Sequence, residues 1–133
     1  MVQPMKRWLD VGTVVLTALL LVLFALPALR GLIDPQLVSA RFGVGVSDPA
    51  GALFFRAYLP RNLVIVVTSA IFLLLGQWRA LAILISVTAA LPVFDLFMLS
   101  LNGVTPPALH PVALVLLVVT AVLLWRRALI GGT

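Results

Sequence analysis

The chain has 133 residues, of which 63% are hydrophobic and only 10% are charged, and its formal net charge at pH 7 is +5. Soluble domains carry about 25% charged residues and disordered chains are poor in apolar residues, so this composition excludes a disordered chain and argues against a soluble one. Most of the nine basic residues flank apolar segments without interleaved aromatic residues, so we do not expect nucleic-acid binding. The composition predicts one all-α integral membrane domain over residues 1–133.

The first predicted membrane helix covers residues 9–29. It contains an uncharged run over residues 11–29, which follows two basic residues. The apolar part of a signal peptide is usually about 7–15 residues long, so we interpret this longer run as a retained membrane helix. Gly31 and Pro35 are expected to end the helix, and residues 30–48 form the longest polar connection in the chain.

The second predicted helix covers residues 49–75. Asp48 followed by Pro49 is typical of a helix start, with an aspartate N-cap and proline at the first helical position. A helix of this length extends about 40 Å, which exceeds the ~30 Å hydrocarbon core of a bilayer. Its first turns are therefore expected at the interface, and Pro60 is expected to kink or restart it.

Two further predicted helices complete the chain. Residues 76–79 predict a tight hairpin turn, and the third helix then covers residues 80–101, with an interruption near Pro92. A turn over residues 102–107 leads into the fourth helix, over residues 108–126. The predicted fold is therefore a four-transmembrane-helix bundle with a tight hairpin at the inner end and a longer outer loop between the first two helices.

Basic and aromatic residues at the helix ends predict the orientation of this bundle. Four spans place both termini at the same face, which carries five basic residues against four at the other face. The positive-inside rule favours a cytoplasmic location for this face, and tryptophan is typical of membrane interfaces. We therefore expect cytoplasmic termini, in a bacterial inner (plasma) membrane. The residues that mark the face are Lys6, Arg7, Arg79, Arg126 and Arg127, together with Trp8, Trp78 and Trp125.

Ionisable residues on three helices are predicted to share one depth in the membrane. Arg61 precedes Trp78 by 17 residues and Asp95 follows it by 17 residues. Both side chains should therefore lie about 25 Å from the inner turn of an antiparallel hairpin. His110 precedes Trp125 by 15 residues, which places it at almost the same level. The sequence thus predicts an Arg/Asp/His layer near the outer face.

This layer has a structural interpretation and a functional one. In the structural interpretation, Asp95 pairs with Arg61 to offset the cost of its charge in the membrane, and His110 caps the fourth helix. In the functional interpretation, Asp95 and His110 are catalytic acid–base residues, because a carboxyl group and an imidazole exchange protons near neutral pH. The candidate ligand-binding residues around them are Arg56, Tyr58, Arg61 and Asn102.

Three functions suit these residues. The first is the binding of a lipophilic ligand in the layer, or service as an accessory subunit. The second is a membrane-embedded acid–base enzyme on a lipid, isoprenoid or quinone-like substrate, with Arg61 as an electrostatic clamp. The third is a small dimeric multidrug-type transporter, which needs a carboxylate reachable from both faces, whereas Asp95 lies near one of them.

The expected partners are membrane lipids, with a lipophilic small molecule and a homodimer left open. We predict no cofactor. We also predict no metal site, because the chain has one histidine and lacks cysteine.

Several of these residues also carry a resemblance. The segment Ala40-Arg41-Phe42-Gly43-Val44, the pair Arg56 and Arg61, Asp95 late in the third helix and His110 opening the fourth are similar to a family of small four-helix membrane proteins, DoxX-like in general look, whose function is unknown. In that family an acid usually follows the second arginine, and here the position is Asn62. The resemblance implies four helices and a polar outer layer, and it implies no reaction.

Overall fold

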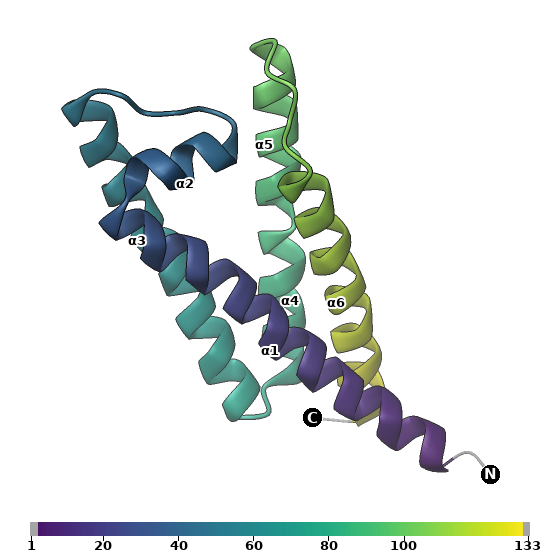
Figure 1. Ribbon diagram of the computed structural model, residues 1–133. Helices are drawn as coiled ribbons and strands as arrows, with labels where there is room; N and C mark the ends of the chain where they lie inside the picture. Colours follow the sequence, from purple (N-terminus) through teal and green to yellow (C-terminus); the bar gives the residue numbers. More distant parts are fainter. Residues whose placement is uncertain (1–2, 132–133) are drawn as a thin grey trace.

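The chain folds entirely into helices and loops over the residues that the structure describes. This structure is a computed structural model, which describes the backbone of residues 3–131 and the side chains of residues 8–130. The helices are α1 (Gln3–Ile33), α2 (Pro35–Phe42), α3 (Pro49–Leu74), α4 (Trp78–Thr88), α5 (Ala90–Leu101) and α6 (Leu109–Gly131) (Figure 1).

Four of these segments are long and apolar enough to cross a membrane: Trp8–Ile33, Pro49–Leu74, Trp78–Leu101 and Leu109–Ile130. Their exposed surfaces carry many leucine, valine, isoleucine and phenylalanine side chains. Such surfaces suit contact with lipid, because contiguous apolar patches of this extent are rare on soluble monomers. The predicted all-α fold with four membrane-spanning segments is therefore confirmed.

The connection over residues 30–48 is more ordered than we predicted, because it contains α2. Asp34 is the N-cap of this helix, its Oδ1 accepting a hydrogen bond of 3.0 Å from the Leu37 N–H, and Pro35 occupies the first turn. Gly43 ends the helix with φ +109°, in the left-handed region that favours glycine. The sequence contains these cap residues, but the helix is only eight residues long and is more polar than the membrane-spanning helices.

Helix α1 begins at Gln3, before the predicted start at residue 9, and it ends at Ile33, beyond Gly31. Gly31 was expected to end the helix, yet it lies inside α1, which ends at Ile33 immediately before the Asp34 cap. A Cβ atom at Gly31 would meet the Leu59 side chain of α3. This glycine therefore permits close packing of α1 on α3.

The start of α3 agrees with the prediction. The Asp48 Oδ1 accepts a hydrogen bond of 2.8 Å from the Gly51 N–H, and Pro49 is the first helical residue. The helix does not restart at Pro60, which lies inside a continuous α3. Membrane helices tolerate an internal proline, because local adjustments satisfy the backbone groups that it frees.

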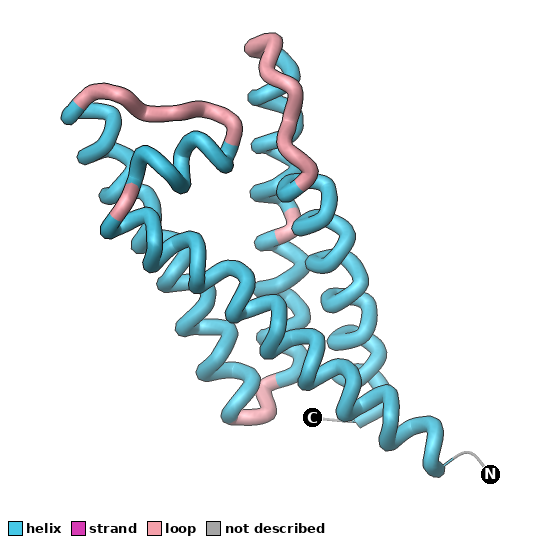
Figure 2. The backbone as a smooth tube through the Cα atoms, viewed as in Figure 1, coloured by secondary structure: helices cyan, strands magenta, loops and turns pink. Residues whose placement is uncertain are grey.

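The predicted interruption of the third span is confirmed. The span divides into α4 and α5 at Ala89, which Figure 2 shows as a short non-helical step. Pro92 has no N–H, so it cannot donate to the Thr88 carbonyl four residues earlier. The turn between α3 and α4 is as tight as predicted and includes Gly76, with φ +67°.

The helices form two groups that pack most closely at one end. α1 packs mainly on α3, and α4 packs mainly on α6, whereas α3 and α5 diverge away from the α3–α4 turn (Figure 1). The start of α1 and the end of α6 lie at the end of the bundle that holds the α3–α4 turn; we call it the termini end, and the opposite end the α2 end. The main core lies in the termini half and consists of Leu20, Leu81, Ala82, Ile85, Leu117, Ala121 and Leu124.

Polar contacts also join α6 to α4 and to α1 at the termini end. The Arg127 guanidinium lies 3.7 Å from the centroid of the Trp78 ring and donates a hydrogen bond of 2.9 Å to the Asp10 carbonyl of α1. The Trp125 indole N–H donates to the Ser86 Oγ at 3.1 Å. Trp78 and Trp125 therefore stabilise the packing between helices. Both also lie at the end of the bundle where interfacial tryptophans were predicted.

Candidate functional site

The Asp95 carboxylate and the His110 imidazole meet at the α2 end of the bundle. The His110 Nδ1 on α6 lies 3.5 Å from the Asp95 Oδ2 on α5. The His110 residue is 3% exposed, and the Asp95 side chain is 26% exposed. The shared depth that residue counting predicted for these two groups therefore corresponds to a contact between them.

The second nitrogen of His110 binds the backbone of α2. The His110 Nε2 lies 2.9 Å from the Phe42 carbonyl oxygen, and the Phe42 ring packs edge-on against the imidazole at 4.6 Å between centroids. A carbonyl oxygen only accepts hydrogen bonds, so Nε2 carries a hydrogen. The Phe42 carbonyl belongs to the last turn of α2, where carbonyls lack helical donors. One imidazole thus holds α2, α5 and α6 together.

The contact with Phe42 limits what the Nδ1 atom of His110 can present to Asp95. Because Nε2 carries a hydrogen toward Phe42, the Nδ1 atom of His110 faces Asp95 either with a lone pair or with a second hydrogen. At 3.5 Å, the Nδ1 and Oδ2 atoms form an ion pair when the imidazole is protonated.

The predicted pairing of Asp95 with Arg61 is wrong. The partner of Asp95 is His110, and this is the single ion pair among the side chains of residues 8–130. Arg61 is exposed and belongs to α3, which diverges from α5 toward the α2 end (Figure 1). Counting residues from the hairpin turn predicts the depth of a side chain but neither its direction around the helix axis nor the splay of the helices.

The other predicted ligand-binding residues lie at different distances from this pair. Tyr58 on α3 is half-buried and lies within range of electrostatic interaction with both Asp95 and Arg61. Arg56 is exposed and lies five residues before Arg61 on α3, further toward the α2 end. Asn102 is exposed, and its Nδ2 donates to the Met98 carbonyl at 2.8 Å, so it serves as a cap of α5.

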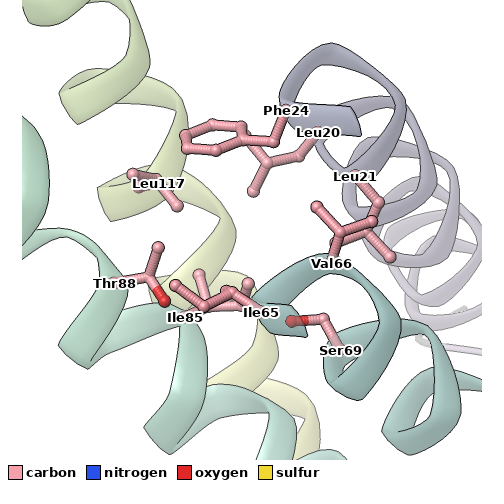
Figure 3. A pocket seen from close by; sticks show the side chains of 9 residues that line it. All are labelled: Leu20, Leu21, Phe24, Ile65, Val66, Ser69, Ile85, Thr88 and Leu117. Carbon is pink, nitrogen blue, oxygen red and sulfur yellow. The ribbon is translucent and has the colours of Figure 1, made fainter. Parts of the chain in front are cut away.

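An apolar cleft lies between the two helix groups, toward the middle of the membrane. The cleft is shallow: the space it encloses is about 10 Å³, roughly that of one water molecule. The cleft begins one helical turn from Arg61, at Ile65, and about two turns from Asp95, at Thr88. Figure 3 shows its lining residues, which come from α1, α3, α4 and α6: Leu20, Leu21, Phe24, Ile65, Val66, Ser69, Ile85, Thr88 and Leu117.

Sequence reasoning missed this cleft and the role of Phe42. The lining side chains are mostly of the types that fill any membrane helix, so nothing in their order marks a cavity. The signal for Phe42 was the following Gly43, which is typical of a helix C-terminus whose carbonyls seek donors. Among residues 3–131, the histidine and acidic side chains form no group of three that could hold a metal ion.

Comparisons of the chain with protein-family models, with curated proteins and with solved structures give no match.

Proposed function

We propose that this protein binds a lipophilic ligand with an anionic head, with the head near Arg61 and Tyr58 and the chain lying along the mouth of the apolar cleft. The observation that carries the proposal is the cleft itself, which all four spanning segments line and which begins within two helical turns of the ionisable residues. The order of ionisable residues followed by an apolar cleft matches the order of polar head and apolar chain in an amphiphile.

The charges at the α2 end favour an anionic head. Asp95 lies against His110, and among the side chains of residues 8–130 neither Arg56 nor Arg61 forms an ion pair. The other two acids at this end are occupied as helix caps, Asp34 toward Leu37 and Asp48 toward Gly51. The guanidinium groups of Arg56 and Arg61 therefore have no carboxylate partner in the protein and can bind a carboxylate or phosphate group of a ligand. With the predicted orientation, the head lies in the outer leaflet.

Photo-crosslinking tests this proposal. The protein is reconstituted in phosphatidylcholine nanodiscs with octadecanoic acid that carries a diazirine in its chain, and the crosslinked peptides are mapped by mass spectrometry. We expect crosslinks on the cleft residues of α1 and α3 and a loss of most of the yield in Arg61→Gln. Arg79→Gln, at the termini end, is the matched control and should retain the native yield.

Two results would overturn the proposal. The first is a crosslink pattern spread evenly over the lipid-facing helix surfaces, since this indicates ordinary bilayer contact. The second is an equal yield in the two arginine variants, since the head would then have no preference for Arg61. Circular dichroism and size-exclusion chromatography of each variant establish that the comparison concerns folded protein.

Acid–base catalysis on a lipid is a second candidate, favoured by the partial exposure of Asp95 beside an imidazole. Because both His110 nitrogens are occupied, Asp95 would be the group that exchanges a proton with a substrate, and His110 would position it. Incubation with lipid extract should then yield a product in the native protein and not in Asp95→Asn. Equal lipid profiles in the two samples would refute this candidate.

A further inference from the structure

Helix α2 links the two helix groups at the α2 end of the bundle. It follows α1 directly through the Asp34 cap, and it packs on α1 and α3. Its last turn lies against α6, where the Phe42 carbonyl accepts a hydrogen bond from His110 and the Phe42 ring packs on the same imidazole. Figure 1 shows α2 at the end where α3 and α5 diverge. The hydrogen bond from His110 therefore joins the two groups where their helices separate.

The buried His110 imidazole faces two hydrogen-bond acceptors. Its Nε2 lies 2.9 Å from the Phe42 carbonyl oxygen, and its Nδ1 lies 3.5 Å from the Asp95 Oδ2. A protonated imidazole carries a hydrogen on each nitrogen and can donate to both acceptors, whereas a neutral imidazole carries one hydrogen and can donate to only one. Protonation of Asp95 has the same effect, because a carboxylic acid can donate to Nδ1. Both contacts are therefore satisfied only while the pair holds two protons, one of them on Nε2.

Charge decides which acceptor keeps the hydrogen when one proton leaves. A hydrogen bond to an ionised carboxylate is about twice as strong as a neutral one. An ionised carboxylate within a membrane-spanning segment, as Asp95 is, also costs free energy when it has no partner. The single hydrogen of the neutral imidazole is therefore expected on Nδ1, toward Asp95. The Nε2 atom then presents a lone pair to the Phe42 carbonyl oxygen, and the hydrogen bond that holds α2 is lost.

We propose that the Asp95–His110 pair is a pH-dependent switch, which holds α2 on α6 while it carries two protons and releases α2 when it loses one. Imidazole ordinarily titrates between about pH 5 and 8, so release is expected as the pH rises through this range. Release removes a hydrogen-bonded link between the two helix groups at the α2 end. The switch requires no ligand, so it is independent of the proposed function.

The other ionisable side chains around the pair keep their charge in this pH range. Tyrosine and arginine ordinarily titrate at about pH 10 or above, and aspartate at about pH 4. Residues 90–125, which include α5 and most of α6, contain no ionisable side chain besides the pair. Those on α2, on α3 and at their caps are Asp34, Arg41, Asp48, Arg56, Tyr58 and Arg61.

Amide hydrogen exchange of the ligand-free protein in nanodiscs tests this switch. Exchange is followed by mass spectrometry from pH 5 to 8, and each rate is divided by the chemical exchange rate at that pH. We expect the corrected rates of residues 38–44 to rise about fivefold across this range, which is the change that one neutral hydrogen bond provides. Residues 116–124, in the core half of α6, are the internal reference and should show no change.

Amide variants assign the effect to the pair. In Asp95→Asn the amide can donate to a neutral Nδ1, so Nε2 keeps its hydrogen toward Phe42 and exchange in α2 should stay slow up to pH 8. Asp48→Asn, at the cap of α3, is the matched control and should retain the native pH dependence.

Two results overturn the switch. The first is a corrected exchange rate in α2 that stays constant or falls from pH 5 to 8 in the native protein. The second is a rise that Asp95→Asn retains. Where Asp95→Asn does not fold, His110→Gln decides, because its amide can donate to the Phe42 carbonyl at every pH. Slow exchange at both ends of the pH range in this variant supports the switch, and a remaining pH dependence overturns it.

Discussion

Replacing His110 by alanine should loosen the α2 end of the bundle. The change removes the hydrogen bond to the Phe42 carbonyl, the contact with Asp95 and the edge-on packing against the Phe42 ring. The neutral hydrogen bond contributes about 1 kcal/mol and the aromatic contact ~0.5–1.5 kcal/mol. Loss of the partner of a fully buried charge costs about 3–5 kcal/mol, but the Asp95 side chain is 26% exposed, so its share is lower. We expect a total loss of about 3 kcal/mol.

Two amide variants divide this loss between the two nitrogen atoms. Glutamine places its side-chain amide near the position of Nε2, so His110→Gln should retain the contact with Phe42 and lose that with Asp95. Asparagine reaches the position of Nδ1, so His110→Asn should retain the contact with Asp95 and lose that with α2. Each amide variant should therefore cost less than the alanine variant.

Stability and local protection are both measurable for this series. Unfolding in mixed micelles with increasing denaturing detergent measures the free-energy changes, and amide hydrogen exchange reports the opening of α2. His110→Ala and His110→Asn should speed exchange in α2, whereas His110→Gln should not. A free-energy change below about 0.5 kcal/mol in the alanine variant, with unchanged exchange in α2, would refute the role of the imidazole as a joint between helices.

Three further predictions concern single residues. Gly43→Ala should destabilise the protein by about 1–3 kcal/mol in the same unfolding assay, because φ +109° is strained for alanine and its Cβ would lie 3.1 Å from Pro107; an unchanged midpoint would contradict this. Arg127→Gln should cost about 1–2 kcal/mol by loss of the Trp78 and Asp10 contacts, and Leu129→Ala, an exposed position, should cost less. Ser69→Ala should be neutral or stabilising by up to about 1 kcal/mol in ligand-free protein, and a marked loss would mean that the hydroxyl has a partner.

Much of the site could not be predicted because it depends on the splay of the helices. The depth of Asp95 and His110 followed from residue counts, since the rise of a helix is constant. The partner of Asp95 did not follow, because helices of similar composition can splay or approach without any change in their hydropathy pattern. α5 packs on α6 and diverges from α3, so the imidazole lies near the carboxylate and Arg61 does not.

The sequence by itself determined the class of the protein, the number of spans and most of the helix boundaries. Length, apolarity and caps such as Asp48 with Pro49 act locally, along one helix, and are readable from neighbouring residues. Only the tertiary structure decided that His110 joins three helices and that an apolar cleft forms between them, with the buried Ser69 among its lining residues. These features arise between helices, where the packing of whole segments determines which side chains meet.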